Sequence, residues 1–202
     1  MGNAGAAGVW PADSDTATSS LFRFSVEADV MIRCDVKFGL WLLLVLFVSS
    51  GYSQEVTPPT TWYVVRHADR DGSHDALTEA GVQRSDRLAE LMQILRVNHI
   101  YSTDTERTRN TAGPTAAKMS LPVKLYGDLD KSWFDQIKVK HPGDVVLIVG
   151  HSNTADKIVE GLGGKGNFSL DDDEYDSLFV VSTKGQEARA MRIRYGSQSG
   201  KK

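Results

Sequence analysis

The sequence predicts an α/β fold, a three-layer α/β/α sandwich around a mostly parallel sheet. From residue 61 onward, short β-branched runs alternate with stretches of helical periodicity, which is typical of a sheet covered by helices on both faces. The run "DVVLIVG" at 144–150 is apolar throughout, as expected for a central strand. Two strands end in histidine-bearing turns, "VVRHA" and "IVGHSN". Because such sheets bind ligands beyond the carboxyl ends of their strands, these turns mark a candidate site.

The first predicted elements occupy residues 61–102. The segment "TWYVV" at 61–65 has the composition of a strand. Residues 77–96 predict a helix with Thr78 as its N-cap. The apolar stripe of this helix consists of Leu88, Leu91, Met92 and Leu95. The segment "HIYS" at 99–102 predicts a short second strand.

The alternation continues through the middle of the chain. Residues 105–119 predict a helix that is interrupted or bent at Gly113-Pro114, because proline lacks the backbone donor that a helix interior needs. Residues 121–126 predict a third strand, and residues 131–140 predict another helix.

The last predicted elements close the fold. A helix at 154–161 follows the central strand and ends in a glycine-rich segment. Residues 176–182 and 188–195 then predict a hairpin around Thr183-Lys184-Gly185. We expect residues 196–202 to be a disordered tail.

Length and composition fit one ordinary domain with an appendage. The chain has 202 residues, of which 41% are hydrophobic and 24% charged, enough for a sizeable core. Its formal net charge of −3 supplies no basic field, so we expect no nucleic-acid partner.

The N-terminal part predicts a secretion signal. Residues 1–30 show no periodicity and are interpreted as an unstructured extension or a mis-called start upstream of Met31. Residues 31–53 combine basic residues, a short apolar run and small residues, which is typical of a signal peptide cut before Gln54. The alternative is an N-terminal anchor through residues 38–50. We therefore expect a periplasmic or secreted protein, with no stable membrane partner if the signal is cleaved, whose folded domain spans 54–195.

The first histidine turn suggests phosphate chemistry. His67 follows a strand end, and a neutral imidazole is a competent nucleophile toward phosphorus. The adjacent Arg66 offers a planar guanidinium that matches phosphate oxygens and stays charged. In "YSTDTERTRNTA", Arg107 and Arg109 follow the next strand, but their helical spacing prevents both from facing one point. We expect Arg107 to face the site.

The second histidine turn would complete an anion pocket. His151 follows the central strand, and in its protonated form it could stabilise charge on phosphate oxygens. Ser152, Asn153 and Thr154 can begin the next helix. Two arginines and two histidines would hold a phosphate dianion without a metal, so we expect no cofactor and no metal.

These motifs resemble those of the histidine phosphatase superfamily, the phosphoglycerate mutase-like fold. The resemblance rests on Arg66-His67, "LTEAG" at 77–81, Ser102…Arg107…Thr111-Ala112 and Gly150-His151-Ser152-Asn153, and runs from about residue 62 to 181. It implies a transient phosphohistidine on His67 and a phosphate pocket of Arg66, Arg107 and His151. It also implies substrate contacts by Ser152 and Asn153.

The proton donor for the leaving group is left open. Ala68-Asp69 stands where the mutase branch has Gly-Glu, and Ser152 stands where the acid-phosphatase branch has aspartate. The mutase branch's acid would fall near "YGDLDK", which makes Asp128 the first candidate and Asp130 the second. Asp69 and Asp75 are the alternatives. Acyl phosphates, aryl phosphates and phosphoramidates would need less help from an acid.

Other polar residues are not assigned to the site. His74, His99 and His141 show no ligand spacing, and we expect each to be structural or exposed. The segment "DDDEYD" at 171–176 lacks the pattern of a calcium-binding loop, and we interpret it as a solvated acidic loop.

The resulting hypothesis is a metal-independent phosphatase that hydrolyses a phosphate monoester or phosphoramidate through a phosphohistidine. Its partner would be a phosphorylated small molecule or protein. The alternatives are a non-catalytic phosphate-binding module of the same fold, or a phosphomutase. The sequence does not predict an oligomeric state.

Overall fold

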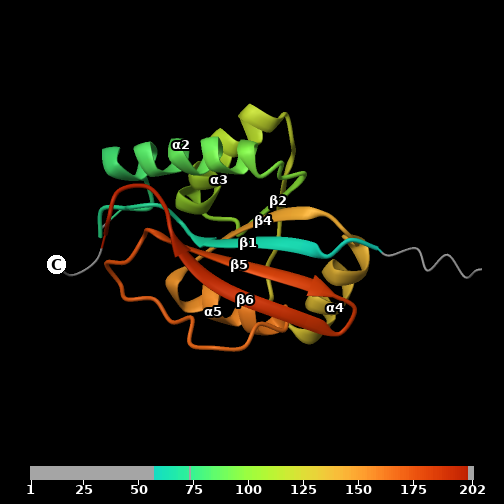
Figure 1. The fold of residues 1–202 in the computed structure, drawn as a ribbon. Helices are drawn as coiled ribbons and strands as arrows, with labels where there is room; N and C mark the ends of the chain where they lie inside the picture. The colour runs from blue at the N-terminus through green and yellow to red at the C-terminus, as the bar shows by residue number, and fades with distance from the viewer. Residues whose placement is uncertain (1–56, 73, 200–202) are drawn as a thin grey trace, which may run out of the picture. The chain divides into compact units, whose positions relative to one another are not determined.

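The computed structural model describes residues 57–72 and 74–199 (Figure 1). The extension at 1–30, the signal or anchor at 31–53 and the end of the tail at 200–202 lie outside the described residues. Within the described ranges, no helix is long and apolar enough to cross a membrane.

Six strands form one sheet in the spatial order β3-β2-β4-β1-β5-β6 (Figure 1). The pairs β1–β4, β2–β4 and β2–β3 are parallel, whereas β5 runs antiparallel to both β1 and β6. The predicted mostly parallel sheet is therefore confirmed, with an antiparallel hairpin at one edge. The strands are β1 (Thr60–Arg66), β2 (His99–Ser102), β3 (Val123–Leu125), β4 (Val145–Gly150), β5 (Ser177–Lys184) and β6 (Glu187–Arg194).

Helices cover both faces of the sheet, as the three-layer prediction requires. Figure 1 shows α2 (Glu79–Ile94) and α3 (Glu106–Met119) on one face, and α4 (Lys131–Lys140) and α5 (Ser152–Gly161) on the other. Strand β1 is buried except at the half-buried Thr61, and its alternate residues serve two separate cores. Trp62 and Val64 pack on the α4–α5 side, while Tyr63 and Val65 pack on the α2–α3 side.

Local features explain where two helices begin and continue. Thr78 caps α2, as predicted, by accepting a hydrogen bond from the Gly81 N–H. Helix α3 is not interrupted at Pro114, which corrects the prediction of a break but leaves a bend untested. A single missing donor does not stop this helix, because its buried threonine face packs against the protein interior.

Helix α5 starts two residues earlier than predicted. His151 is its N-cap, and the Thr154 hydroxyl accepts a hydrogen bond from the His151 N–H at 2.8 Å. Gly150 is required just before it, because a Cβ there would lie 2.8 Å from Thr154 Oγ1 and 2.9 Å from Tyr126 Oη. A glycine therefore lets β4 run directly into the helix that begins at the second histidine.

The C-terminal elements differ from prediction in two details. Strand β5 extends through Lys184, so the hairpin turns later, at Gly185, whose φ of +59° suits glycine. The described part of the expected disordered tail is bound to the domain. The Ser197 carbonyl accepts from Arg84 at 2.9 Å, and the Ser199 hydroxyl accepts from the Asp176 N–H at 2.9 Å. These hydrogen bonds fix the residues that follow β6.

Candidate active site

His67 lies at the carboxyl end of β1 and is almost fully buried, with 3% of its surface exposed. Its backbone N–H donates to the Gly150 carbonyl at 2.8 Å, and this bond joins the ends of β1 and β4. Its Nδ1 lies 2.8 Å from the Ala68 carbonyl. Because a carbonyl can only accept, Nδ1 carries the proton, and Nε2 presents a lone pair.

Burial also keeps this imidazole neutral. Desolvation by burial, together with the smaller influence of the neighbouring Arg66 and Arg107 cations, lowers the pKa of His67 to about 3. Only the neutral ring has a lone pair on Nε2, so His67 has the protonation state of a nucleophile at neutral pH.

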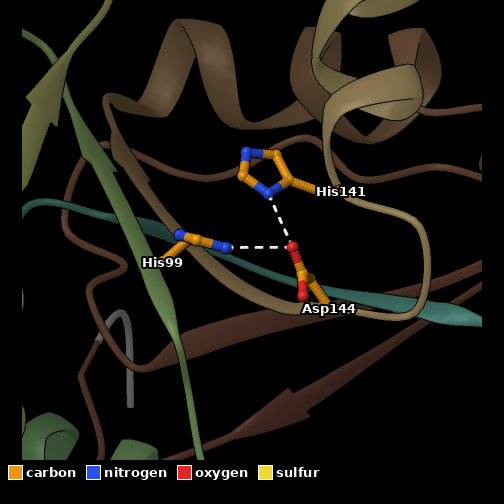
Figure 2. A group of neighbouring side chains, drawn as sticks. All are labelled: His99, His141 and Asp144. Carbon is orange, nitrogen blue, oxygen red and sulfur yellow. Dashed lines mark hydrogen bonds and ion pairs between the residues drawn. The ribbon is translucent and has the colours of Figure 1, made fainter.

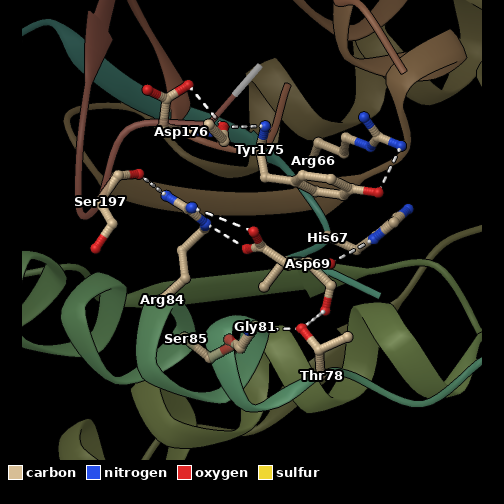
Figure 3. Close-up of polar contacts among 12 residues, drawn as sticks. Arg66, His67, Asp69, Thr78, Gly81, Arg84, Ser85, Tyr175, Asp176 and Ser197 are labelled. Carbon is tan, nitrogen blue, oxygen red and sulfur yellow. Dashed lines mark hydrogen bonds and ion pairs between the residues drawn. The ribbon is translucent and has the colours of Figure 1, made fainter. Parts of the chain in front are cut away.

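Arg66 is oriented by the segment at 171–175. Its Nη1 donates to the carbonyls of Asp171, Asp172 and Glu174 at 3.1, 2.8 and 3.2 Å. The guanidinium lies over the Tyr175 ring, 4.1 Å from its centroid (Figure 3). The predicted solvated acidic loop thus has a second role, because its backbone oxygens hold the guanidinium next to His67.

Arg107 reaches the same site from the first turn of α3. It forms an ion pair with Asp75, whose other carboxylate oxygen accepts the Glu106 N–H at 2.8 Å. Its Nη2 lies 3.2 Å from His151 Nδ1. Arg109, by contrast, pairs with Asp104 and has about half its side chain exposed. The prediction that Arg107 rather than Arg109 faces the site agrees with this geometry.

His151 is placed by hydrogen bonds on both ring nitrogens. Arg107 can only donate, so Nδ1 accepts and Nε2 carries the proton, which it donates to Thr103 Oγ1 at 2.9 Å. The Thr103 hydroxyl in turn donates to Thr108 Oγ1 at 3.0 Å. Burial, and then Arg107, lower the pKa of His151. The expected protonated ring is therefore neutral in this arrangement, which corrects the prediction for the pocket without an anion.

The four predicted groups converge. The ring centroids of His67 and His151 lie 5.6 Å apart, although the residues are far apart in the chain. Within the described residues, the Nε atoms of Arg66 and Arg107 are buried without a hydrogen-bond partner. Buried donors of this kind are rare in folded proteins, and oxyanions are the ligands that guanidinium groups commonly bind. The arrangement can hold a phosphate beside a neutral imidazole.

Part of the chain matches a known protein family. The family model of the histidine phosphatase superfamily (branch 1) matches residues 62–130, a range that contains Arg66, His67, Asp75 and Arg107. The resemblance to this superfamily that the sequence predicted is therefore confirmed over these residues. No curated protein matches the chain significantly.

Solved structures share the fold of this chain. The phosphoglycerate mutase of Bacillus anthracis strain Sterne aligns with a TM-score of 0.55 at 15% identity, covering 68% of this chain and 94% of the other. A mycobacterial glucosyl-3-phosphoglycerate phosphatase aligns with a TM-score of 0.51 at 13% identity, covering 68% of this chain and 98% of the other. These similarities establish the phosphoglycerate mutase-like fold that the sequence predicted.

The four aspartates that the sequence offers as proton donors lie in different surroundings. Asp128 is exposed in the loop between β3 and α4, and Asp130 is the N-cap of α4, accepting from the Trp133 N–H at 2.7 Å. Asp69 bonds Arg84 through both carboxylate oxygens, at 2.6 and 3.3 Å (Figure 3). Only Asp75, among these four, contacts a pocket residue in the described structure.

The histidine turn is held by its own supporting contacts. The Ala68 N–H donates to Thr111 Oγ1 at 2.8 Å, and the Thr111 hydroxyl donates to the Arg107 carbonyl at 2.7 Å. Gly81 allows α2 to approach this turn, because a Cβ there would lie 2.1 Å from the Asp69 carbonyl oxygen. This close contact explains the glycine of "LTEAG" and fixes α2 against the nucleophile turn.

Three further polar residues, Ser152, Asn153 and Tyr175, lie close to the histidines of the site. Ser152 and Asn153 lie in the first turn of α5, directly after His151, and their substrate contacts stay a prediction. Tyr175 was not anticipated, although its ring lies 5.9 Å from that of His67 and its hydroxyl 3.4 Å from Arg66 Nη2. The single aromatic residue within the acidic run was the only sequence signal for it.

Proposed function

We propose that the chain is a metal-independent phosphatase that transfers a phosphoryl group to His67 and then to water. The observation that carries this proposal is the pairing of a neutral His67, whose proton resides on Nδ1, with two arginines whose buried Nε donors lack partners. The first group supplies the nucleophile, and the second supplies donors for the oxygens of a phosphate dianion.

The first step forms a bond between His67 Nε2 and phosphorus while the bond from phosphorus to the leaving oxygen or nitrogen breaks. Arg66 and Arg107 neutralise the transferring group, as two fixed cations would in any phosphoryl transfer. In the second step, water attacks phosphorus, the N–P bond breaks, and inorganic phosphate leaves with the neutral imidazole restored. A base must accept one proton from the attacking water.

Asp75 is suited to that second step. Its hydrogen bond from Arg107 lowers the pKa of the carboxyl, so it is ionised at neutral pH and can accept a proton. As the donor for the first step it would have to be protonated first, against the influence of Arg107. We therefore infer a substrate whose leaving group needs little protonation, such as a phosphoramidate or an activated phosphate monoester.

The substrate is proposed to be a phosphorylated small molecule or protein outside the cytoplasm. This part of the proposal rests on the signal-like residues 31–53, which lie outside the described structure. N-terminal sequencing of the mature protein checks it, since a product that begins at Gln54 is expected. A product that retains residues 38–50 in the membrane fraction would favour the anchored alternative.

The catalytic proposal is tested by trapping the intermediate. The protein is mixed briefly with a radiolabelled phosphoramidate or aryl phosphate and quenched, and the label should be acid-labile and base-stable. His67→Asn should carry no label, while His74→Asn, an exposed histidine, should be labelled like the wild type. Tight binding of phosphate without label or product would instead support a phosphate-binding module. Transfer to an added alcohol rather than water would support a phosphomutase.

Leaving-group dependence tests the role of Asp75. With Asp75→Asn, we expect breakdown of the phosphoenzyme to slow, so label accumulates on His67 with an activated substrate. Rapid quench measurements of labelling and release separate the two steps. If labelling slows only for poor leaving groups and release is unchanged, Asp75 is the acid of the first step instead.

A further inference from the structure

A second histidine cluster lies at the end of the parallel strands opposite to the candidate active site. His99 is the first residue of β2, His141 is the C-cap of α4, and Asp144 immediately precedes β4. Figure 2 shows both imidazole rings directed at the carboxylate of Asp144. His151 follows the other end of β4, so the length of this strand separates the two histidine sites.

The three side chains offer one ligand atom each to a common point. His99 Nε2 lies 2.9 Å and His141 Nδ1 lies 2.8 Å from the same carboxylate oxygen, Asp144 Oδ2. All three atoms lie within 4.8 Å of one another. The two ring centroids are 4.2 Å apart. Two imidazole nitrogens and a carboxylate oxygen form a ligand set that zinc commonly takes.

We propose that His99, His141 and Asp144 bind a divalent transition-metal ion, with zinc as the best match, and that water completes the coordination. The proposal is independent of the phosphatase activity. It also revises the expectation that these histidines lack ligand spacing, because they come together only in the fold.

The geometry needs a small adjustment to accept the ion. Tetrahedral zinc holds nitrogen and oxygen ligands at about 2.0–2.1 Å, which separates ligand atoms by roughly 3.3–3.4 Å. The two hydrogen-bonded contacts to Asp144 must therefore lengthen by about 0.5 Å. About a quarter of the side chains of His99 and Asp144 is exposed, which leaves room for this shift and for water.

Neighbouring residues already orient two of the ligands. His141 is 1% exposed, and its Nε2 lies 2.9 Å from the Tyr101 hydroxyl. Asn98 donates to Asp144 Oδ1 at 3.1 Å, which leaves Oδ2 for the ion. Such outer partners fix the ring orientation and the free lone pair of metal ligands.

Lys124 opposes the ion and supplies a sharp test. Its Nζ lies 3.3 Å from His99 Nδ1 and can only donate to it. When His99 binds a metal through Nε2, its proton moves to Nδ1, so the ammonium group must turn away. Replacing Lys124 should therefore strengthen metal binding rather than weaken it.

The expected role of the ion is structural. It would join the end of α4 to the starts of β2 and β4, where the carboxylate of Asp144 now bridges the two histidines. Because an ion that binds only the folded state stabilises that state, zinc should raise the thermal midpoint. Turnover at the other end of β4 should not depend on it.

Metal binding is measured on the full 202-residue chain by titration with zinc chloride and by the visible spectrum of the cobalt-substituted protein. We expect one equivalent at the cluster, with a tetrahedral cobalt spectrum. His99→Asn and Asp144→Asn should weaken binding at least about tenfold, while Lys124→Met should strengthen it. His67→Asn should keep the binding, which excludes His67 as its source.

His74→Asn is the matched control, because His74 and Asp71 are also a histidine–aspartate pair spaced by three residues but lie on the surface. It should bind the ion like the wild type. Equal zinc affinity in the wild type, His99→Asn and Asp144→Asn would overturn the proposal, as would the absence of saturable binding. Circular dichroism checks that each variant is folded. If His99→Asn does not fold, the near-isosteric Asp144→Asn provides the test by itself.

Discussion

The two histidine pairs of this protein lie at opposite ends of the parallel strands of the sheet and differ in the charge of their neighbours. His67 and His151, at the carboxyl ends of β1 and β4, adjoin two guanidinium groups. His99 and His141, near the amino ends of β2 and β4, share the carboxylate of Asp144. The pairs are similarly close, with ring centroids 5.6 and 4.2 Å apart.

The difference shows that neighbours, not the imidazoles themselves, decide what a histidine pair can bind. Fixed cations beside the first pair favour an anion, whereas an anionic oxygen between the second pair favours a cation. The position in the sheet adds a second distinction. Parallel strands direct their carboxyl ends toward a substrate crevice, and in this fold only the first pair lies there.

Removing the nucleophile should give the largest effect. His67→Asn keeps a polar side chain of similar size but has no imidazole lone pair to attack phosphorus. We expect kcat for an aryl phosphate to fall by at least about a thousandfold. Steady-state assays measure kcat for the wild type and the variant, and His74→Asn is the control. A loss of less than tenfold would mean that phosphoryl transfer does not pass through His67.

Removing one cation should give the next largest effect. Arg107→Ala takes away the guanidinium that contacts His151 and has a buried Nε without partner. We expect kcat/KM to fall by about 10²–10³, the usual loss for one donor to a transition-state oxyanion. Arg109→Ala is the matched control, because Arg109 pairs with Asp104 on the surface. Equal losses in the two variants would contradict the assignment of Arg107.

Tyr175 allows a finer comparison of ring and hydroxyl. Tyr175→Phe keeps the ring over Arg66 and should change kcat/KM by about twofold, since the hydroxyl contact at 3.4 Å is long. Tyr175→Ala removes the ring as well and should lower kcat/KM by about tenfold, because Arg66 loses a cation–π contact. If both variants lose activity equally, the hydroxyl rather than the ring is what matters.

The smallest expected effect is on the pH dependence of stability. The folded-state pKa of His67 is about 3, below its usual value near 6.5, so between these values the unfolded chain binds the extra proton. Stability therefore falls as the pH is lowered from about 6.5 toward 3. Thermal midpoints between pH 7 and 4 should decline less steeply for His67→Asn than for the wild type. Parallel curves would show that burial of His67 does not lower its pKa.

Much of the fold could be predicted from the sequence, because its signals are local. The strand "HIYS" and the helix 131–140 have the boundaries that their composition indicated, and Thr78 caps α2 as expected. The continuity of α3 through Pro114 and the early start of α5 depend on packing and on the Thr154 cap. Such tertiary contacts override the local propensity of the sequence, so the local sequence does not predict them.

The candidate site could be predicted in part for the same reason. Arg66, His67 and His151 directly follow or end predicted strands, and parallel strands bring such ends together. Tyr175 could not be placed, because no local pattern shows that a loop of acidic residues folds over the end of β1. Nor could the aspartates be ranked, since only the structure shows that Asp75 contacts Arg107 whereas Asp69 contacts Arg84.

By itself, the sequence determined the layered α/β architecture, the strand ends that carry the first histidine pair, and the superfamily motifs. These depend on side-chain periodicity and on neighbours within a few residues. Tertiary structure alone decided the neutral state of His151, the role of the loop at 171–175, and the meeting of His99, His141 and Asp144. Protonation and ligand binding depend on charges a few ångströms away in space, and the fold brings those charges from distant parts of the chain.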